Sequence, residues 1–369
     1  MAIRNAFLKL HLWMGLGAAV LVFLLALSGT ILVFDNEIDR FLNPKLLTVA
    51  PQSTNVPITD MIRSVQQAYP GHSVVNIGIN ARPDLAWQFI LGGRGIVFAY
   101  VNPHTGAVTG SRARDKNFIY YVHQLHTHLL LGKTGEVIVA YGTLCLLFLM
   151  FSGLYLWWQR KLLTIKTAGS WRRINFDLHN LSGFYSLAFL FVVVFTGLMM
   201  SFPKPLYPVV YTIAGASPDE PDEEELPPVP PPQKGARPIT PDQAVAIGRT
   251  LLPGAQPTFL QIPRGPRANY DLGFKFPEDE TPGGRSKVVI DKFSGLPIEV
   301  LNSRTASKAT RIGNLVRPLH TGDIYGWPSR IVFALASFSV VVQAITGVLI
   351  WLLRLRRTRQ KEQPAPVLV

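Results

Sequence analysis

The sequence contains a single cysteine, Cys145, and it lies within an apolar run. One cysteine permits no internal disulfide bond, and it excludes covalent c-type haem attachment, which requires a C-x-x-C-H motif. Charged residues are also scarce, at 16% of the chain against roughly 25% in an ordinary soluble domain. Together with a hydrophobic fraction of 48% and a positive mean hydropathy, this scarcity indicates a membrane protein.

Motifs of nucleotide and hydrolytic chemistry are missing as well. The chain has no G-x-G-x-x-G after a strand and no P-loop. It also has no G-x-S-x-G elbow and no H-E-x-x-H. Any flavin or nicotinamide chemistry must therefore come from a partner.

Four uncharged runs are each long enough to cross a bilayer, which takes about 20 residues of helix. They are residues 12–34, 137–158, 181–203 and 331–353. Arg4 and Lys9 precede the first run as they would in a signal peptide, but the run is too long and no small-x-small cleavage site closes it. We therefore expect four spanning helices, within residues 1–35, 136–159, 179–203 and 329–353, the first of them uncleaved.

Basic residues predict the orientation of these helices. The short segments at one face carry twelve basic residues and two acids, Asp177 and Glu362. The basic residues are Arg4, Lys9, Arg160, Lys161, Lys166, Arg172, Arg173, Arg354, Arg356, Arg357, Arg359 and Lys361. By the positive-inside rule this face is cytoplasmic, so both termini, the loop 160–178 and the tail 354–369 are inside. Topology thus accounts for nearly all of the net charge of +13, and no nucleic-acid partner is expected.

The two long segments between the helices, 36–135 and 204–328, are then outside, and each predicts a small α+β domain. We expect helices over about 57–71 and 238–254, with Thr59 and Thr240 as N-caps and Pro241 in the first turn. Strands are expected at 87–91, 96–101, 270–276 and 287–290, followed by turns at 102–106 and 291–295. The acidic, proline-rich stretch 218–233 has the composition of a linker.

An internal repeat divides the chain into two halves that align without gaps around their histidines. Aligning His11 with His179 pairs Gly15 with Gly183, Ser28-Gly29 with Thr196-Gly197, and Phe34 with Phe202. Aligning His126 with His320 pairs Ser152-Gly153 with Thr346-Gly347 and Trp157 with Trp351. Each half is a helix, an outside domain and a second helix. Both halves run in the same direction, which predicts two parallel repeats about an axis along the membrane normal.

The repeat places four histidines at matched heights. His11 and His179 lie at the cytoplasmic ends of helices one and three, and His126 and His320 at the outside ends of helices two and four. Two histidines that close on one iron from opposite sides form a b-type haem site. Gly15 and Gly183, one turn beyond His11 and His179, leave room for a flat macrocycle. The sequence therefore predicts two non-covalent b haems, one near each membrane surface.

Other readings of these residues stay open. The spacing of His123, His126 and His128 could suit zinc or copper, but no acid or thiol lies nearby to complete such a site. His128 is the alternative outer haem ligand, and His123 a weaker one. His72 and His104 have no counterpart in the repeat and are expected at the surface. The glycine pairs would also suit close helix packing, and a histidine at a membrane interface is often only a polar group.

Arginines near both histidine pairs are candidates for binding haem propionates through charge-assisted hydrogen bonds. They are Arg317, Arg112 and Arg114 near the outside pair, and Arg172 and Arg173 near the inside pair. Anchoring at the membrane interface is an equal alternative for all five.

The segments 10–34, 125–158, 178–202 and 319–322 resemble the PepSY-associated transmembrane proteins. The outside segments, with their turns at 102–106 and 291–295, resemble PepSY domains. The resemblance covers nearly the whole chain. It implies a multi-pass protein of the bacterial inner membrane, embedded in the lipid bilayer, with two periplasmic PepSY-like domains. Two positions depart from the pattern: Asn102 stands where an aspartate is usual, and His128 adds a histidine.

This family includes siderophore-iron reductases that carry two b haems. The resemblance implies that the protein is a haem-dependent ferric-chelate reductase. It would take electrons from a quinol or a cytoplasmic flavoprotein and reduce a ferric siderophore in the periplasm for iron uptake. The alternative is a non-enzymatic sensor or assembly factor that binds a peptide or protein through its PepSY-like domains. A haem transporter is a third option, against which paired histidine ligation argues.

Overall fold

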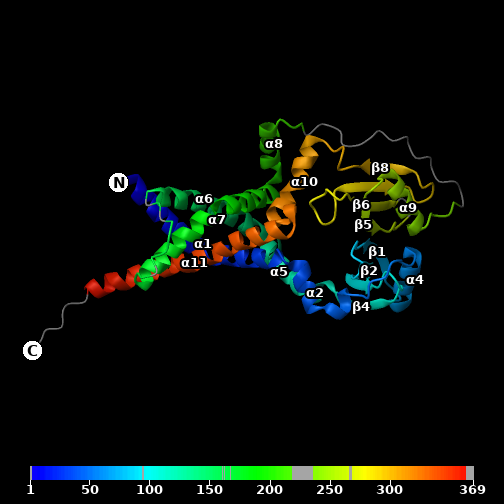
Figure 1. The fold of residues 1–369 in the computed structure, drawn as a ribbon, viewed down its shortest axis with the longest axis horizontal. Helices are drawn as coiled ribbons and strands as arrows, with labels where there is room; N and C mark the ends of the chain where they lie inside the picture. The colour runs from blue at the N-terminus through cyan, green and yellow to red at the C-terminus, as the bar shows by residue number, and fades with distance from the viewer. Residues whose placement is uncertain are drawn as a thin grey trace, which may run out of the picture. The chain divides into compact units, whose positions relative to one another are not determined.

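The computed structural model describes residues 2–362 except 94, 160, 162, 167, 218–235 and 266–267, with the backbone alone for 357–362. The described chain forms two compact units (Figure 1). The helical unit comprises residues 1–34, 121–207 and 319–369, and the sheet unit comprises 35–120 and 208–318. Each unit is described by itself.

Four long helices make up most of the helical unit: α1 (Ala2–Leu32), α6 (Gly132–Trp158), α7 (Trp171–Ser201) and α11 (Trp327–Glu362). Each contains a stretch long and apolar enough to cross a membrane, with a mean hydropathy of 2.1 to 2.3. The four predicted spanning helices are thus confirmed. Helices α1 and α7 both begin well before their uncharged runs, so His11 and His179 lie inside a helix rather than at its start.

Packing among these helices forms a four-membered bundle. Helices α1 and α7 each pack against both α6 and α11, which places α1 diagonally opposite α7. The apolar core between them includes Val22 of α1, Leu190 and Val194 of α7, and Val340 of α11. At the start of α11, the Arg330 guanidinium donates to the carbonyl oxygen of Val33 and so ties α11 to the end of α1.

Shorter helices connect the two units along the chain. Helices α5 (Phe118–His128) and α10 (Lys308–Thr321) lead into α6 and α11, and they carry His126 and His320. Helices α2 (Asp35–Leu42), α3 (Pro44–Leu47) and α8 (Pro203–Ala214) follow α1 and α7. Two short 3₁₀ turns, Arg114–Lys116 and Asp323–Tyr325, precede α5 and α11.

The turn from α5 into α6 is strained. It passes through Leu129 and Leu130, whose φ angles are 50° and 60°. A residue other than glycine pays about 1–3 kcal/mol for this left-handed conformation. The corresponding turn from α10 into α11 uses Gly322 and Gly326, whose φ angles of 82° and 62° carry no such penalty.

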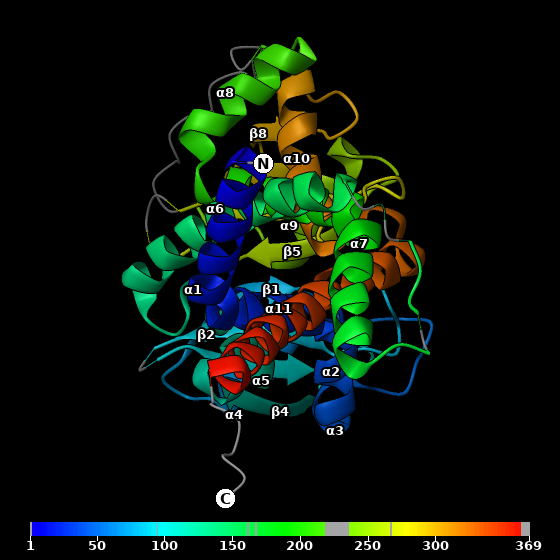
Figure 2. The same cartoon turned by 90° about the vertical axis from the view of Figure 1, so that its left-hand side faces the viewer.

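Among the described residues, the sheet unit holds eight antiparallel strands in one sheet, in the order β4-β3-β2-β1-β5-β6-β7-β8. The first segment supplies β1 (Ser73–Gly78), β2 (Trp87–Gly92), β3 (Val97–Val101) and β4 (Val108–Ala113). The second supplies β5 (Gln256–Gln261), β6 (Tyr270–Lys275), β7 (Ser286–Ile290) and β8 (Pro297–Leu301). The two segments meet where β1 pairs with β5, and Figure 2 shows these strands side by side.

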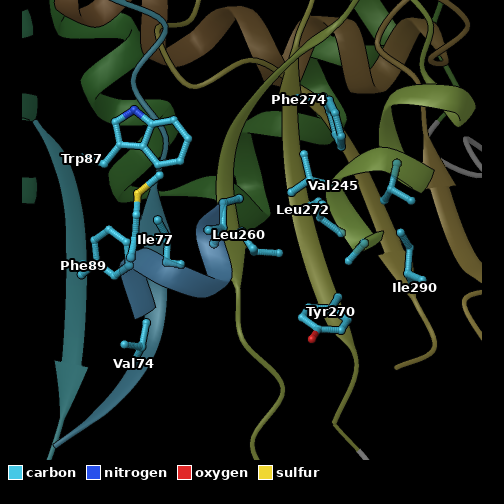
Figure 3. Close-up of a cluster of buried hydrophobic side chains, with 14 of the residues drawn as sticks. Val74, Ile77, Trp87, Phe89, Val245, Leu260, Tyr270, Leu272, Phe274 and Ile290 are labelled. Atoms are coloured by element: carbon cyan, nitrogen blue, oxygen red, sulfur yellow. The ribbon is translucent and has the colours of Figure 1, made fainter. Parts of the chain in front are cut away.

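A shared core supports this sheet. Helices α4 (Ile58–Ala68) and α9 (Pro241–Leu251) pack against the strands and against each other. Figure 3 shows side chains from both segments in one cluster, among them Ile77, Phe89, Leu260 and Leu272, all of them fully buried. The two segments that supply the strands therefore form one continuous layer with a common core.

The two helix starts differ from each other. Thr240 caps α9 as predicted, in a capping box with Gln243. The prediction for Thr59 is wrong, because α4 already begins at Ile58 with Pro57 before it. Asp242 of α9 instead accepts the backbone N–H groups of Ile58 and Thr59 at 2.7 and 3.0 Å. A carboxylate suits this place because the start of a helix is electropositive and has free N–H donors.

Candidate functional site

The structure brings the four repeat histidines together in two pairs. His11 of α1 and His179 of α7 face each other across the bundle, with their ring centroids 6.5 Å apart. His126 of α5 and His320 of α10 form the second pair, with a separation of 6.2 Å. The pairing is the one that the alignment of the two halves predicts.

Each histidine is held by a serine or threonine that is followed by a glycine on another helix. In the inner pair, His11 Nδ1 lies 2.8 Å from Ser152 Oγ, and His179 Nδ1 lies 3.0 Å from Thr346 Oγ1. In the outer pair, His126 Nδ1 lies 3.1 Å from Ser28 Oγ, and His320 Nδ1 lies 3.2 Å from Thr196 Oγ1. These four Ser/Thr-Gly pairs are the ones that align between the two halves of the sequence.

The hydrogen bonds determine which ring nitrogen carries the proton. Each of the four hydroxyls donates its own proton to a carbonyl three or four residues earlier in its helix, so towards the histidine it can only accept. Three of the Nδ1 atoms also face a carbonyl oxygen, of Leu25, Val193 or Gln343, at 2.9 to 3.1 Å. Nδ1 is therefore the protonated nitrogen in all four rings. The lone pair of Nε2 is left free to bind a metal, and the hydrogen bond that Nδ1 donates fixes the orientation of the ring.

The glycine of each Ser/Thr-Gly pair lets the imidazole approach the helix backbone. A Cβ atom at Gly29 or Gly197 would lie 3.0 or 3.1 Å from the Cε1 atom of His126 or His320. At Gly153 and Gly347 it would lie 3.3 Å from Cε1 of His11 and His179. All four distances are shorter than ordinary van der Waals contact, so a side chain at any of these positions would push the ring away.

The spacing within each pair suits one metal ion between two imidazoles. A metal–nitrogen bond of about 2.0–2.1 Å and an Nε2 atom about 1.1 Å from its ring centroid place two trans imidazoles roughly 6.2–6.4 Å apart. The observed separations of 6.5 and 6.2 Å lie at this value. Two neutral imidazoles on opposite sides of one iron are the ligand set of a bis-histidine b haem. The residues present thus fit the predicted cofactor at both sites.

Electrostatics keep the outer pair neutral. Burial, reinforced by the nearby His320, lowers the pKa of His126 to about 4. Burial likewise lowers the pKa of His320. Both rings are therefore uncharged near neutral pH, which is the form that binds a metal.

The other candidate histidines occupy different surroundings. His128 is the last residue of α5, and its Nδ1 lies 2.6 Å from the neighbouring Thr127 hydroxyl. The ring that faces His320 is that of His126, so the geometry favours His126 as the outer ligand over His128 and His123. Among the described residues no three or more His, Cys, Asp or Glu side chains form a group able to hold a metal ion, so the zinc or copper alternative finds no support.

The expectation of a surface histidine is wrong for His104, which is 8% exposed. Its Nδ1 and Nε2 lie 2.8 and 2.7 Å from the carbonyl oxygens of Thr54 and Pro83, so it joins two loops of the sheet unit. His72 is partly buried beside Gly93. Neither ring lies in the helical unit.

The turn that contains Asn102 and His104 shows what the asparagine does at a position where an aspartate is usual. The Asn102 side-chain oxygen accepts the N–H of His104 at 2.9 Å. In the corresponding turn, Asp291 accepts from the N–H and hydroxyl of Ser294, both at 2.7 Å. Burial raises the pKa of Asp291, but the bonds from Ser294 and Phe293 outweigh it and lower that pKa. Asparagine thus keeps the acceptor that the turn uses but lacks the charge.

The remaining residues that the sequence predicts for the haem sites are Gly15, Gly183 and the arginines. A Cβ atom at Gly15 would face Leu149 at 3.8 Å, and one at Gly183 would face Gln343 Oε1 at 3.2 Å.

Arg112 forms two hydrogen bonds to Asp39, and Arg173 pairs with the buried Asp177 at 2.8 Å, so both already have acidic partners. Arg114 lies over the ring of Tyr120. Arg172 is exposed in the first turn of α7, and Arg317 is exposed on α10, three residues before His320.

Four membrane-length helices with two facing histidine pairs, linked to an antiparallel sheet, define a multi-pass membrane protein with two paired-histidine sites. A family model for the PepSY-associated TM region matches residues 8–354. Since the match covers nearly the whole chain, the protein belongs to this family, as the sequence resemblance predicted. No curated protein matches the chain.

Proposed function

We propose that the protein is a haem-dependent ferric-chelate reductase that carries electrons across the bacterial inner membrane. The observation that carries the proposal is the pair of histidine sites, whose spacing and protonation suit two bis-histidine b haems. Bound there, the two haems would supply one-electron transfer through their Fe(III)/Fe(II) couples.

The helices hold the two sites at different depths. On α1, His11 belongs to the inner site, and Ser28, which holds His126, belongs to the outer one. At about 1.5 Å per residue, the 17 positions between them span roughly 25 Å. On α7 the same interval separates His179 from Thr196. The buried side chains of Val22, Leu190 and Val194 lie at intermediate positions and make the space between the sites apolar. The recurrence of these contacts in both halves supports two parallel repeats.

Charge supports the direction of transfer. By the positive-inside rule, the basic segments favour a cytoplasmic position for both termini and the inner pair, where a quinol or a flavoprotein would be the donor. The sheet unit and the outer pair would then face the periplasm, where a ferric siderophore would be the acceptor. Hard oxygen donors favour the higher charge of Fe(III), so reduction to Fe(II) loosens the chelate and releases the iron.

Purified protein tests the proposal directly. We expect a b-type Soret band, two haems per chain that acid acetone extracts, and reduction of a ferric siderophore after reduction with dithionite. His72→Ala is the matched control, since this histidine lies in the sheet unit, and it should keep both haems. A colourless protein that cannot be reconstituted with haem would contradict the proposal and favour the sensor or assembly factor. One haem per chain, or haem that stays with the polypeptide, would contradict the paired sites.

A further inference from the structure

The two halves of the bundle differ in polarity beside the inner histidine pair. From the level of His179 toward the middle of the bundle, α7 carries Ser182 and Ser186, and α11 carries Gln343 and Ser339. The aligned positions of the first half are apolar or weakly polar: Met14, Ala18, Leu149 and Cys145. None of these eight side chains is exposed. The difference in polarity between the two halves therefore lies inside the bundle and not on its exposed surface.

Gln343 is the member of this polar set that contacts the His179 ring of the inner site directly. Its backbone carbonyl accepts from His179 Nδ1 at 3.1 Å, and its side-chain amide donates to Ser339 at 3.3 Å. Its Oε1 atom lies against Gly183, 3.2 Å from where a Cβ would stand. At the aligned positions of the first half, Leu149 Cδ2 lies against Gly15, so this contact involves only hydrocarbon. The Gln343 amide beside Gly183 thus corresponds to the Leu149 isobutyl group beside Gly15.

This difference acts on any haem held by His11 and His179. With two neutral imidazole ligands, the iron centre gains one positive charge on oxidation. Polar groups stabilise that charge better than hydrocarbon does, because the interaction with the charge is weakly screened inside the bundle. The Arg173–Asp177 pair also lies near this site, but its charges cancel and stay the same when only Gln343 or Leu149 is changed.

We propose that Gln343 tunes the inner site, lowering the reduction potential of the haem bound by His11 and His179. The inference rests on the proposed function and extends it. A lower potential at the cytoplasmic site favours passage of the electron outward to the second site. Gln343 is thus a tuning residue and not a ligand, and its effect should appear in an equilibrium potential independently of chelate reduction.

The test uses a His126→Ala background, in which the inner haem is the one retained. Redox titration of the visible bands compares Gln343→Leu and Gln343→Met with the parent. At a fixed ambient potential we expect the ratio of reduced to oxidised haem to rise by about two- to tenfold, the range of one hydrogen-bond-sized interaction. The reciprocal Leu149→Gln change should lower the same ratio, and it remains informative if Gln343→Leu folds poorly.

The outcomes separate this inference from the function on which it rests. Unchanged ratios in the Gln343 variants and in Leu149→Gln would overturn the tuning role while leaving the haem sites in place. A fall in the ratio on removing the amide would overturn it as well. Parent protein that binds no haem at all would overturn both the tuning role and the proposed function.

Discussion

Replacing Gly29 with alanine tests whether this glycine is what lets His126 take its place. An alanine Cβ would lie 3.0 Å from His126 Cε1, about 0.4 Å inside the 3.4 Å at which ordinary contact begins. The ring would have to move away from Ser28 and Leu25, which hold its Nδ1. Overpacking of this kind costs about 1–3 kcal/mol. The outer site should therefore bind haem roughly 5- to 150-fold more weakly.

Haem titration of the purified variant, with the outer site followed in a His11→Ala background, measures this affinity. Gly17→Ala is the matched control on the same helix, because a Cβ there meets nothing within 4 Å. Both changes share the gain in helix propensity of about 1 kcal/mol, so the comparison isolates the contact with the ring. Gly197→Ala, with a Cβ 3.1 Å from His320 Cε1, should behave like Gly29→Ala. Equal outer-site affinity in Gly29→Ala and Gly17→Ala would refute the reasoning.

Three further predictions concern the ligands, the topology and the sheet unit. His11→Ala and His179→Ala should lose the same haem by difference spectroscopy, and His126→Ala and His320→Ala the other. A match between His128→Ala and His320→Ala would instead make His128 the outer ligand, whereas one haem lost from both His11→Ala and His320→Ala would contradict the two-site architecture. A reporter fused after Val369 should behave as cytoplasmic and one inserted near Glu223 as exported; the reverse pattern would invert the electron path. Because its folded pKa is depressed, Asp291 contributes stability above its unfolded pKa of about 4 and loses it as pH falls through the folded value. Asp291→Asn should therefore lower the melting temperature at pH 7 and much less once the pH lies below the folded pKa of Asp291, and an equal loss at both would contradict this.

The sequence predicts the membrane helices and the histidine pairs for physical reasons. A bilayer demands about 20 apolar residues per helix, so the four runs are visible without any tertiary information. The gap-free alignment of His11 with His179 and of His126 with His320 then restricts which rings can meet. The Ser/Thr-Gly pairs appear in that same alignment, but a hydroxyl and a glycine have many uses in a helix. Their role becomes apparent only once α6, α7, α11 and α1 are packed together.

Other features were beyond prediction because local signals are weak or misleading there. Leu129 and Leu130 turn the chain between α5 and α6 although leucine carries no turn preference, so the sequence does not indicate a separate helix before α6. Strand β5 contains Pro257, β1 is irregular between Val74 and Asn76, and β4 contains Gly110, and none of the three shows clean alternation. The burial of His104 depends on the carbonyls of Thr54 and Pro83, which the sequence does not connect to it. The stretch 218–233, predicted as a linker, falls within residues that the structure leaves undescribed.

The pairing of β1 with β5 has a consequence for the order of events during synthesis. Asn76 and Ile77 find their partners in Gln261 and Leu260, roughly 180 residues later in the chain. At ~5–20 residues per second the ribosome needs on the order of 10–40 s to make that interval. Throughout this time β1 has one row of backbone N–H and C=O groups without its final partner, and such an edge readily pairs with other chains. The exposed edge of β1 must therefore be kept from pairing with other chains until the second half arrives to cover it.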